Sequence, residues 1–258
     1  MRLFVVLLAI KLLMACSFTE TQRASDKPLT PAYEIVTELD VGPGNITVLP
    51  KGEIIVSLHQ FYGHEDRVVS ISTDGNINPF AEQADLNSVL GLQADSAGVV
   101  WLLDNAMRGG ETPRLVGWDV EKQTVSHDID LSSVTTQQSF LNDLAVDRSN
   151  QAVYIADPAG GEDAAIIVVD LATGFSRRLL QGHNSVVPED VALSIDEKPV
   201  RILQESGEYL YPRIGINPIA LDHDNEWLYY GPMHGLSLYR VRTADLRAEN
   251  LSLAVLAE

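Results

Sequence analysis

Cysteine and positive charge are both scarce in this 258-residue sequence. Cys16 is the single cysteine, which excludes a disulfide within the chain and a metal cluster held by thiolates. Lys and Arg together number 18 against 36 Asp and Glu, so the net charge is −18 at pH 7. Such a surface repels phosphate backbones, and we expect no nucleic-acid partner. With 45% hydrophobic residues the chain can bury a large core, which leaves a soluble enzyme or a binding domain.

Long hydrophobic runs are also lacking. The longest, Leu3 to Ala15, has thirteen residues, is interrupted by Lys11 and follows a short basic start. At about 1.5 Å per residue it is too short to cross a hydrocarbon core of about 30 Å, and it is typical of a secretion signal. The residues LMAC, which end at Cys16, resemble the lipobox of bacterial lipoproteins, in which the cysteine is acylated.

We therefore expect a lipoprotein-type signal peptide over residues 1–16 and a polar tether over 17–39. The protein is predicted to be exported, extracellular or periplasmic, and held at a membrane only through a lipid on Cys16. An unacylated signal or a short hydrophobic arm is the alternative.

Sequence motifs for several common chemistries are missing. The chain has no GxSxG, HExxH, CxxC, P-loop or GxGxxG pattern. Serine hydrolysis, phosphoryl transfer and hydride transfer therefore lose support.

What the chain does contain is a repeated pattern of short β-type runs separated by turn residues. Four segments begin with two strands joined by an Asp, Gly or Asn turn, and each is followed by a third strand. A fourth, more polar strand is clearest over 124–131 and 175–180. The paired strands lie at 46–59, 88–104, 140–157 and 215–232, and the third strands at 67–72, 114–119, 164–170 and 236–241.

A four-stranded antiparallel unit that recurs at about 45 residues predicts a β-propeller. Between the third and fourth units the spacing grows, and we expect an insert over about 182–215, comprising a hairpin and a loop. A β-sandwich also uses short strands and tight turns and is the alternative fold.

Four stretches of the chain resemble the major royal jelly protein/Yellow family, as a bacterial member. They are LLDNAMRGGETPRLVGWD (102–119), FLNDLAVD (140–147), YIAD (154–157) and GINPIALD…EWLYYGPMHGLSLYRV (215–241). The resemblance implies a secreted all-β protein of the six-bladed propeller type, distantly similar to gluconolactonase and senescence-marker-protein propellers. Because residues 40–258 contain about four blades, we expect an incomplete ring with exposed inner strands at its ends, and interpret the chain as C-terminally truncated.

Propeller geometry selects candidate site residues. The start of the first strand and the end of the second strand in each blade emerge on the same face, around the channel. Arg108 lies in the Gly-rich loop that continues from Asp104, where it could hold an anionic ligand. The predicted channel-mouth residues are Asn45, His59, Asp104, Asn105, Arg108, Asn142, Asp143, Asp157, Asn217 and His234.

Amides and a few carboxylates around one channel suit a hard divalent cation, above all Ca²⁺. The resemblance implies that Asn142 and Asn217 correspond to metal ligands of the gluconolactonase-like relatives. Asn45 stands where those relatives have an acidic ligand, and another of their aspartates would fall beyond Glu258. A structural role for these Asn side chains, in which they bond nearby backbone, is the alternative.

Three functional hypotheses remain. The first is an exported propeller that binds a small molecule at the channel mouth. The second is an enzyme, either a metal-assisted lactonase or a dopachrome-type tautomerase, with a cation polarising a carbonyl and a channel histidine or carboxylate moving the proton. The third is a truncated chain without a function of its own.

Overall fold

Short antiparallel strands make up most of the regular structure in this computed structural model, which describes residues 33–58, 60–108 and 111–248. The chain divides into two units, Met1–Ile35 and Val36–Glu258, and all strands of the described residues lie in the second unit. None of the helices within the described ranges is both long and apolar enough to cross a membrane.

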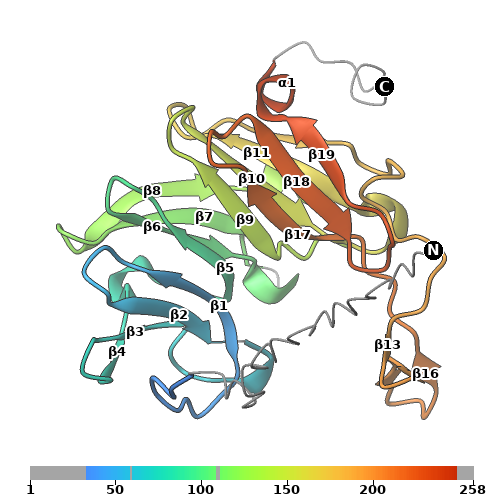
Figure 1. The fold of residues 1–258 in the computed structure, drawn as a ribbon, viewed down its shortest axis with the longest axis horizontal. Coiled ribbons are helices and arrows are strands. Elements are labelled where there is room, and N and C mark those ends of the chain that lie inside the picture. Colours follow the sequence, from blue (N-terminus) through green and yellow to red (C-terminus); the bar gives the residue numbers. More distant parts are fainter. Residues whose placement is uncertain (1–32, 59, 109–110, 249–258) are drawn as a thin grey trace, which may run out of the picture. The chain divides into compact units, whose positions relative to one another are not determined.

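Four sheets follow one another along the chain, and in each the strands pair in sequence order (Figure 1). Blade 1 contains β1 (Pro43–Val48), β2 (Ile54–Leu58), β3 (Val68–Ile71) and β4 (Ile77–Pro79). Blade 2 contains β5 (Val89–Ala94), β6 (Val99–Asp104), β7 (Arg114–Asp119) and β8 (Thr124–Asp130). Blade 3 contains β9 (Asp143–Asp147), β10 (Ala152–Asp157), β11 (Ala165–Asp170) and β12 (Ser176–Leu179).

Blade 4 has three strands within the described part of the chain, followed by a short helix. They are β17 (Ile216–Leu221), β18 (Trp227–Pro232), β19 (Tyr239–Arg242) and α1 (Thr243–Arg247). Single 3₁₀ turns lie in the connections: η1 (Gln60–Tyr62), η2 (Glu82–Ala84), η3 (Ala106–Arg108), η4 (Ser132–Val134) and η5 (Gly161–Asp163). The four-bladed, all-β propeller arrangement predicted from the repeat is confirmed.

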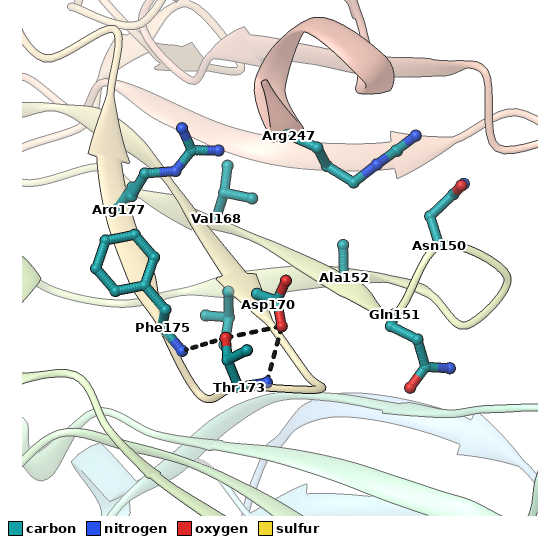
Figure 2. A pocket seen from close by; sticks show the side chains of 10 residues that line it. Asn150, Gln151, Ala152, Val168, Asp170, Thr173, Phe175, Arg177 and Arg247 are labelled. Carbon is teal, nitrogen blue, oxygen red and sulfur yellow. Dashed lines mark hydrogen bonds between the residues drawn. The ribbon is translucent and has the colours of Figure 1, made fainter. Parts of the chain in front are cut away.

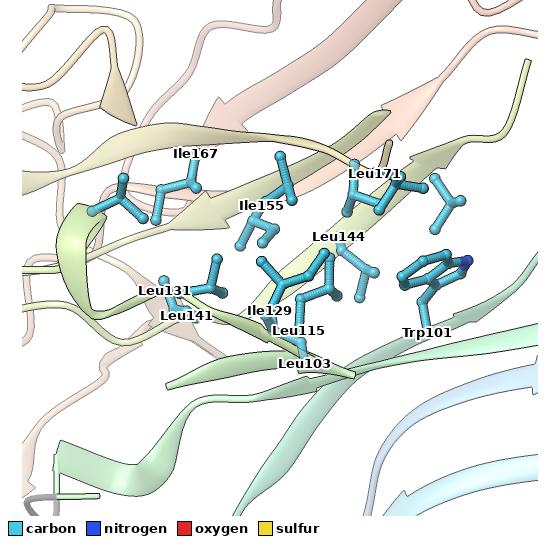
Figure 3. Packing of buried hydrophobic residues seen from close by; sticks show 14 of the residues in the cluster. Trp101, Leu103, Leu115, Ile129, Leu131, Leu141, Leu144, Ile155, Ile167 and Leu171 are labelled. Carbon is cyan, nitrogen blue, oxygen red and sulfur yellow. The ribbon is translucent and has the colours of Figure 1, made fainter. Parts of the chain in front are cut away.

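The second strand of each inner blade is buried along its whole length because a neighbouring blade covers each of its faces. Alternate side chains of β6 point to opposite faces. Trp101 and Leu103 join the core between blades 2 and 3 (Figure 3), whereas Val100 and Leu102 join the core between blades 1 and 2. A third core lies between blades 3 and 4 and includes Leu246 of α1. Continuous apolar runs in β6 and β10 therefore reflect burial on both faces.

The end blades are more open than the inner ones. β1 alternates between exposed and half-buried residues and exposes Ile46 and Val48, and β17 is only partly buried. The innermost strands β5 and β9 of blades 2 and 3 are mostly buried. This difference is the one expected of an incomplete ring.

The insert before blade 4 forms two short hairpins where the sequence predicted one hairpin and a loop. They pair β13 (Ser194–Ile195) with β14 (Lys198–Pro199), and β15 (Ile202–Leu203) with β16 (Tyr209–Leu210). All of these strand residues are exposed.

Candidate functional site

The innermost strands of the four blades line a cavity of about 640 Å³. β1 contacts β5, β5 contacts β9, and β9 contacts β17, so each blade contributes one wall. Along β1 the lining residues alternate between polar (Asn45, Thr47) and apolar (Ile46, Val48), and successive side chains of a strand point to opposite faces. The residues that line it are Asn45, Ile46, Thr47, Val48, Leu92, Gln93, Asp143, Leu144, Ala145, Val146, Ile219, Ala220, Leu221, Asp222 and Asn225.

Irregular strand starts bring polar groups to one end of this channel. The register shifts between Pro43 and Ile46 in β1, at the corresponding place in β5, and between Ile216 and Ile219 in β17. A bulge at such a place re-aims the side chain that it contains. Asn45 and Asn217 both lie within these shifts. Asn45 is among the residues that line the cavity, whereas Asn217 lies outside them, two residues before Ile219.

Asn45 and Asp143 meet across the channel although 98 residues separate them. The Asn45 Nδ2 donates to Asp143 Oδ1 at 3.0 Å, and the same oxygen accepts the Leu144 backbone N–H at 2.8 Å. Burial raises the pKa of Asp143, and these two hydrogen bonds oppose the rise. Asp143 is therefore a half-buried carboxyl that gives up its proton less readily than an exposed one.

Asn142 and Asn217 form a second pair from blades 3 and 4. The Asn142 Nδ2 donates to Asn217 Oδ1 at 2.7 Å, and the Asn217 Nδ2 contacts the Sδ of Met233 at 3.7 Å. Both Asn side chains are half-buried, and Met233 is exposed. The contact with sulfur is weak, so the pair presents the Asn142 carbonyl oxygen as an acceptor and the Asn217 amide as a donor.

In blade 2, Gly91 lies within the register shift of β5, the place that Asn45 occupies in β1 and Asn217 in β17. A Cβ there would lie 2.8 Å from the backbone oxygen of Asn142, closer than real Cβ contacts come. The absence of a side chain therefore lets blades 2 and 3 approach each other at the channel.

Asp104 and Asp157, also predicted at the mouth, are buried in loop networks outside the cavity lining. Asp104 accepts backbone N–H groups of Asn87 and Ser88 and pairs with Arg114 at 3.4 Å. Asp157 accepts the Ser139 hydroxyl and the Phe140 N–H, and it pairs with Arg178 at 2.7 Å. In both blades the carboxylate ties the end of the second strand to the loop that leads into the first.

Asn105 also serves as a connector. Its Nδ2 donates to the backbone oxygen of Leu141 at 3.1 Å, and its Oδ1 accepts the Gln60 Nε2 at 3.1 Å. Phe61 of η1 stacks on Phe140 with ring centroids 5.9 Å apart, so loops of blades 1 and 3 meet here. Sequence reasoning did not anticipate the roles of Gln60, Phe61 and Phe140, since their only signal is a place beside strand ends.

The remaining predicted residues are distributed as follows. His234 is buried, and its Nδ1 accepts the Ile214 backbone N–H at 3.1 Å, which fixes the corner after β18. Arg108 ends η3. His59 and the lipidation candidate Cys16 lie outside the described residues.

The hairpin aspartates that recur in the repeat are turn caps, as their sequence context predicts. Asp95 accepts the Ala97 and Val99 N–H groups, and Asp222 accepts those of Glu226 and Trp227. Asp95 also pairs with Arg148 at 3.7 Å, and Asp222 also lies among the residues that line the cavity.

The described side chains form a poor cage for a divalent cation. No three His, Cys, Asp or Glu side chains gather as a metal-binding group within the described ranges. Asn142 and Asn217 hydrogen-bond to each other, and Asp143 is directed at Asn45 and Leu144. Ca²⁺ takes roughly six to eight oxygen ligands, several of them carboxylates. The assignment of Asn142 and Asn217 as metal ligands therefore stays a prediction.

Comparison with known proteins relates the chain to the major royal jelly proteins, both by a single relative and by a family profile. The chain is similar to Major royal jelly protein 1 of Apis mellifera, with 26% identity over 190 residues. This match covers 66% of the chain but 41% of the bee protein, so the chain spans less than half of that relative.

Solved propellers are more distant. Virginiamycin B lyase from Staphylococcus aureus is 19% identical with a TM-score of 0.43, covering 80% of this chain and 69% of the lyase. A gluconolactonase from Xanthomonas campestris is 12% identical with a TM-score of 0.44, covering 78% of this chain and 56% of that enzyme. Neither likeness bears on what this chain binds or converts.

The family relationship rests on the profile described as "Major royal jelly protein", which matches residues 87–255. This range begins just before β5, includes blades 2, 3 and 4 and covers well over half of the sequence. With the blade pattern and the sequence match in agreement, the chain belongs to the major royal jelly protein family.

Proposed function

We propose that this propeller binds a small, neutral, polyhydroxylated molecule at the channel end formed by Asn45, Asn142, Asp143 and Asn217. The observation that carries the proposal is two hydrogen-bonded pairs of polar side chains from three blades: Asn45 with Asp143 in the cavity lining, and Asn142, which precedes Asp143 in the chain, with Asn217. Donors and acceptors close together match the hydroxyl groups of such a ligand.

Charge favours a neutral ligand over an anion. The chain carries a net charge of −18, and Asp143 adds a carboxylate at the channel end itself. A cavity of about 640 Å³ is large enough to hold a sugar-sized molecule, and its apolar residues would contact the carbon skeleton.

Calorimetric titration with glucono-1,5-lactone tests the proposal, because this probe is neutral, polyhydroxylated and also a substrate for the alternative activity. Asn142→Ala and Asn217→Ala should each weaken binding by about tenfold, the effect of losing a hydrogen bond whose partner stays buried. Asn76→Ala is the matched control, since Asn76 is an exposed turn residue that bonds Asp74. Unchanged affinity in both channel variants, or no binding by the native protein, contradicts the proposal.

Activity assays on the same variants, with the lactone and with dopachrome, separate binding from catalysis. Binding without hydrolysis of the lactone or tautomerisation of dopachrome supports a binding protein. Lactone hydrolysis that is lost in Asn142→Ala would replace the proposal by the enzyme hypothesis. Sensitivity of that hydrolysis to a chelator would then support a metal-assisted reaction.

We also propose that the protein is exported and lipid-anchored through Cys16. The support is the short basic start, the apolar run Leu3 to Ala15 and the adjacent cysteine. Radiolabelled palmitate should be incorporated into the native protein and not into Cys16→Ser, which should leave the membrane fraction. Equal fractionation of both proteins without label would contradict the anchor.

A further inference from the structure

A second cavity, of about 620 Å³, lies at blade 3 beside α1 and shares no lining residue with the channel (Figure 2). Its floor comes from β10 and β11, its sides from the two turns that flank them, and its upper edge from β12 and α1. We call it the arginine groove, and its lining residues are Asn150, Gln151, Ala152, Val168, Val169, Asp170, Thr173, Phe175, Arg177 and Arg247.

The groove combines apolar surface with two guanidinium groups. Ala152, Val168 and Val169 are buried and form its apolar floor, whereas Phe175 is 63% exposed in the turn before β12. An exposed Phe beside a cavity offers a ring face to a ligand at little cost in conformational entropy. The amides of the β9–β10 turn add polar groups at the far side (Figure 2).

Arg177 is held in place without an ion-pair partner among the described residues. Its Nη1 donates to the backbone oxygen of Ala248 at 2.7 Å, and its Nη2 donates to that of Leu246 at 2.9 Å. A guanidinium carries five N–H groups, so these two bonds leave further donors and a full positive charge. The side chain is therefore pre-organised, which reduces the entropy lost when a ligand binds.

Arg247 is partly neutralised. Its Nη1 donates to the Tyr154 hydroxyl at 2.9 Å and to the buried carboxylate of Asp147 at 3.3 Å. The groove also contains the carboxylate of Asp170, which accepts the Thr173 N–H and hydroxyl and whose pKa these bonds lower. A singly charged ligand suits this balance, since a dianion would meet Asp170 and a chain of net charge −18.

We propose that the arginine groove binds a small organic monocarboxylate. Its carboxylate pairs with Arg177, where a planar guanidinium matches a carboxylate in two parallel hydrogen bonds. Its apolar body lies on Val168 and against the ring of Phe175. This site is independent of the channel and of the function proposed for the channel.

The test is calorimetric titration of the full chain with phenylacetate and with phenylacetamide, which has the same shape without the charge. Phenylacetate should bind at least about tenfold more tightly than the amide. Arg177→Met should remove that preference, and Phe175→Ser should weaken both probes severalfold. Arg240→Met is the control, because Arg240 lies over Trp227 in blade 4 and should leave both affinities unchanged.

Arg177→Met could disturb α1, because Arg177 bonds the backbone of Leu246 and Ala248. Phe175→Ser provides a second test of the groove, because Phe175 is exposed and its loss should leave the fold intact. Equal affinity for the acid and the amide would overturn the proposal. So would phenylacetate binding that survives both groove variants or that weakens in Asn142→Ala instead. No binding at 10 mM, on the order of ten-thousandfold above a micromolar Kd, would overturn it as well.

Discussion

The buried ion pair between Arg178 and Asp157 offers the sharpest test of the energetics of this fold. The Arg178 Nη1 lies 2.7 Å from Asp157 Oδ2, and the two side chains are 10% and 0% exposed. Arg178→Met removes the cation and leaves a buried carboxylate without its counter-charge. Loss of one partner of such a pair costs roughly 3–5 kcal/mol. For a domain of this size each kcal/mol corresponds to about 2–4 °C, so Tm should fall by about 6–20 °C.

A matched variant isolates burial as the cause. Arg213 pairs with Asp190 at 2.8 Å, nearly the same distance, but these side chains are 44% and 101% exposed. Arg213→Met should change Tm by little more than the measurement error, because solvent screens exposed pairs. Both variants are compared by thermal and urea denaturation followed by circular dichroism.

A double variant tests the uncompensated charge directly. Asp157→Asn removes the charge, keeps one oxygen for the Phe140 N–H and leaves an amide opposite the Ser139 hydroxyl, which can then accept. Arg178→Met combined with Asp157→Asn should be more stable than Arg178→Met alone. The reasoning is refuted if Arg178→Met costs no more than Arg213→Met, or if the double variant recovers nothing.

Three further outcomes are expected. Burial raises the pKa of Asp143, so the native state holds this proton more tightly than the unfolded chain does. The contribution of this group to the free energy of unfolding therefore becomes less favourable as pH rises from about 4. Asp143→Asn should therefore raise Tm at pH 7, with the gain shrinking in denaturation curves below about pH 4; a gain independent of pH would contradict the sign. A Cβ on Gly215 would meet the backbone oxygen of Val186 at 2.5 Å, so Gly215→Ala should cost about 1–3 kcal/mol in urea titrations. Gly160→Ala, where the nearest atom lies at 3.6 Å, should cost much less, and equal costs would argue against steric crowding. Asp222→Ala removes the cap of the β17–β18 turn and should cost about 1 kcal/mol, and a Tm equal to the native value would show that the cap contributes nothing.

The apolar runs of the second strands were readable from the sequence, whereas their burial on both faces follows from the packing of a blade on each side. Val99–Asp104 and Ala152–Asp157 contain mostly apolar residues, and both are buried from end to end. The turns between strands were equally readable, since Asp95 and Asp222 cap backbone amides only a few residues away. The turn caps depend on neighbours in the chain, which a single sequence displays.

The candidate site was only partly readable. The starts of the inner strands pointed to Asn45, Asn142 and Asn217, but nothing local distinguished them from Asp104, which the structure uses to tie a loop to a strand end. The arginine groove has no recognisable pattern in the sequence, because its lining residues come from β10–β12 and from α1, which are far apart in the chain.

The sequence by itself determined the four-blade repeat, the strand positions and the turn chemistry, because hydrophobic alternation and Asx turns act over a few residues. Tertiary structure decided which polar side chains meet. The contact between Asn142 and Asn217 and the one between Asn45 and Asp143 each require two blades to pack in a particular register. That register depends on bulges and on close approaches such as the one at Gly91, which are properties of packed neighbours and leave only a faint trace in the local sequence.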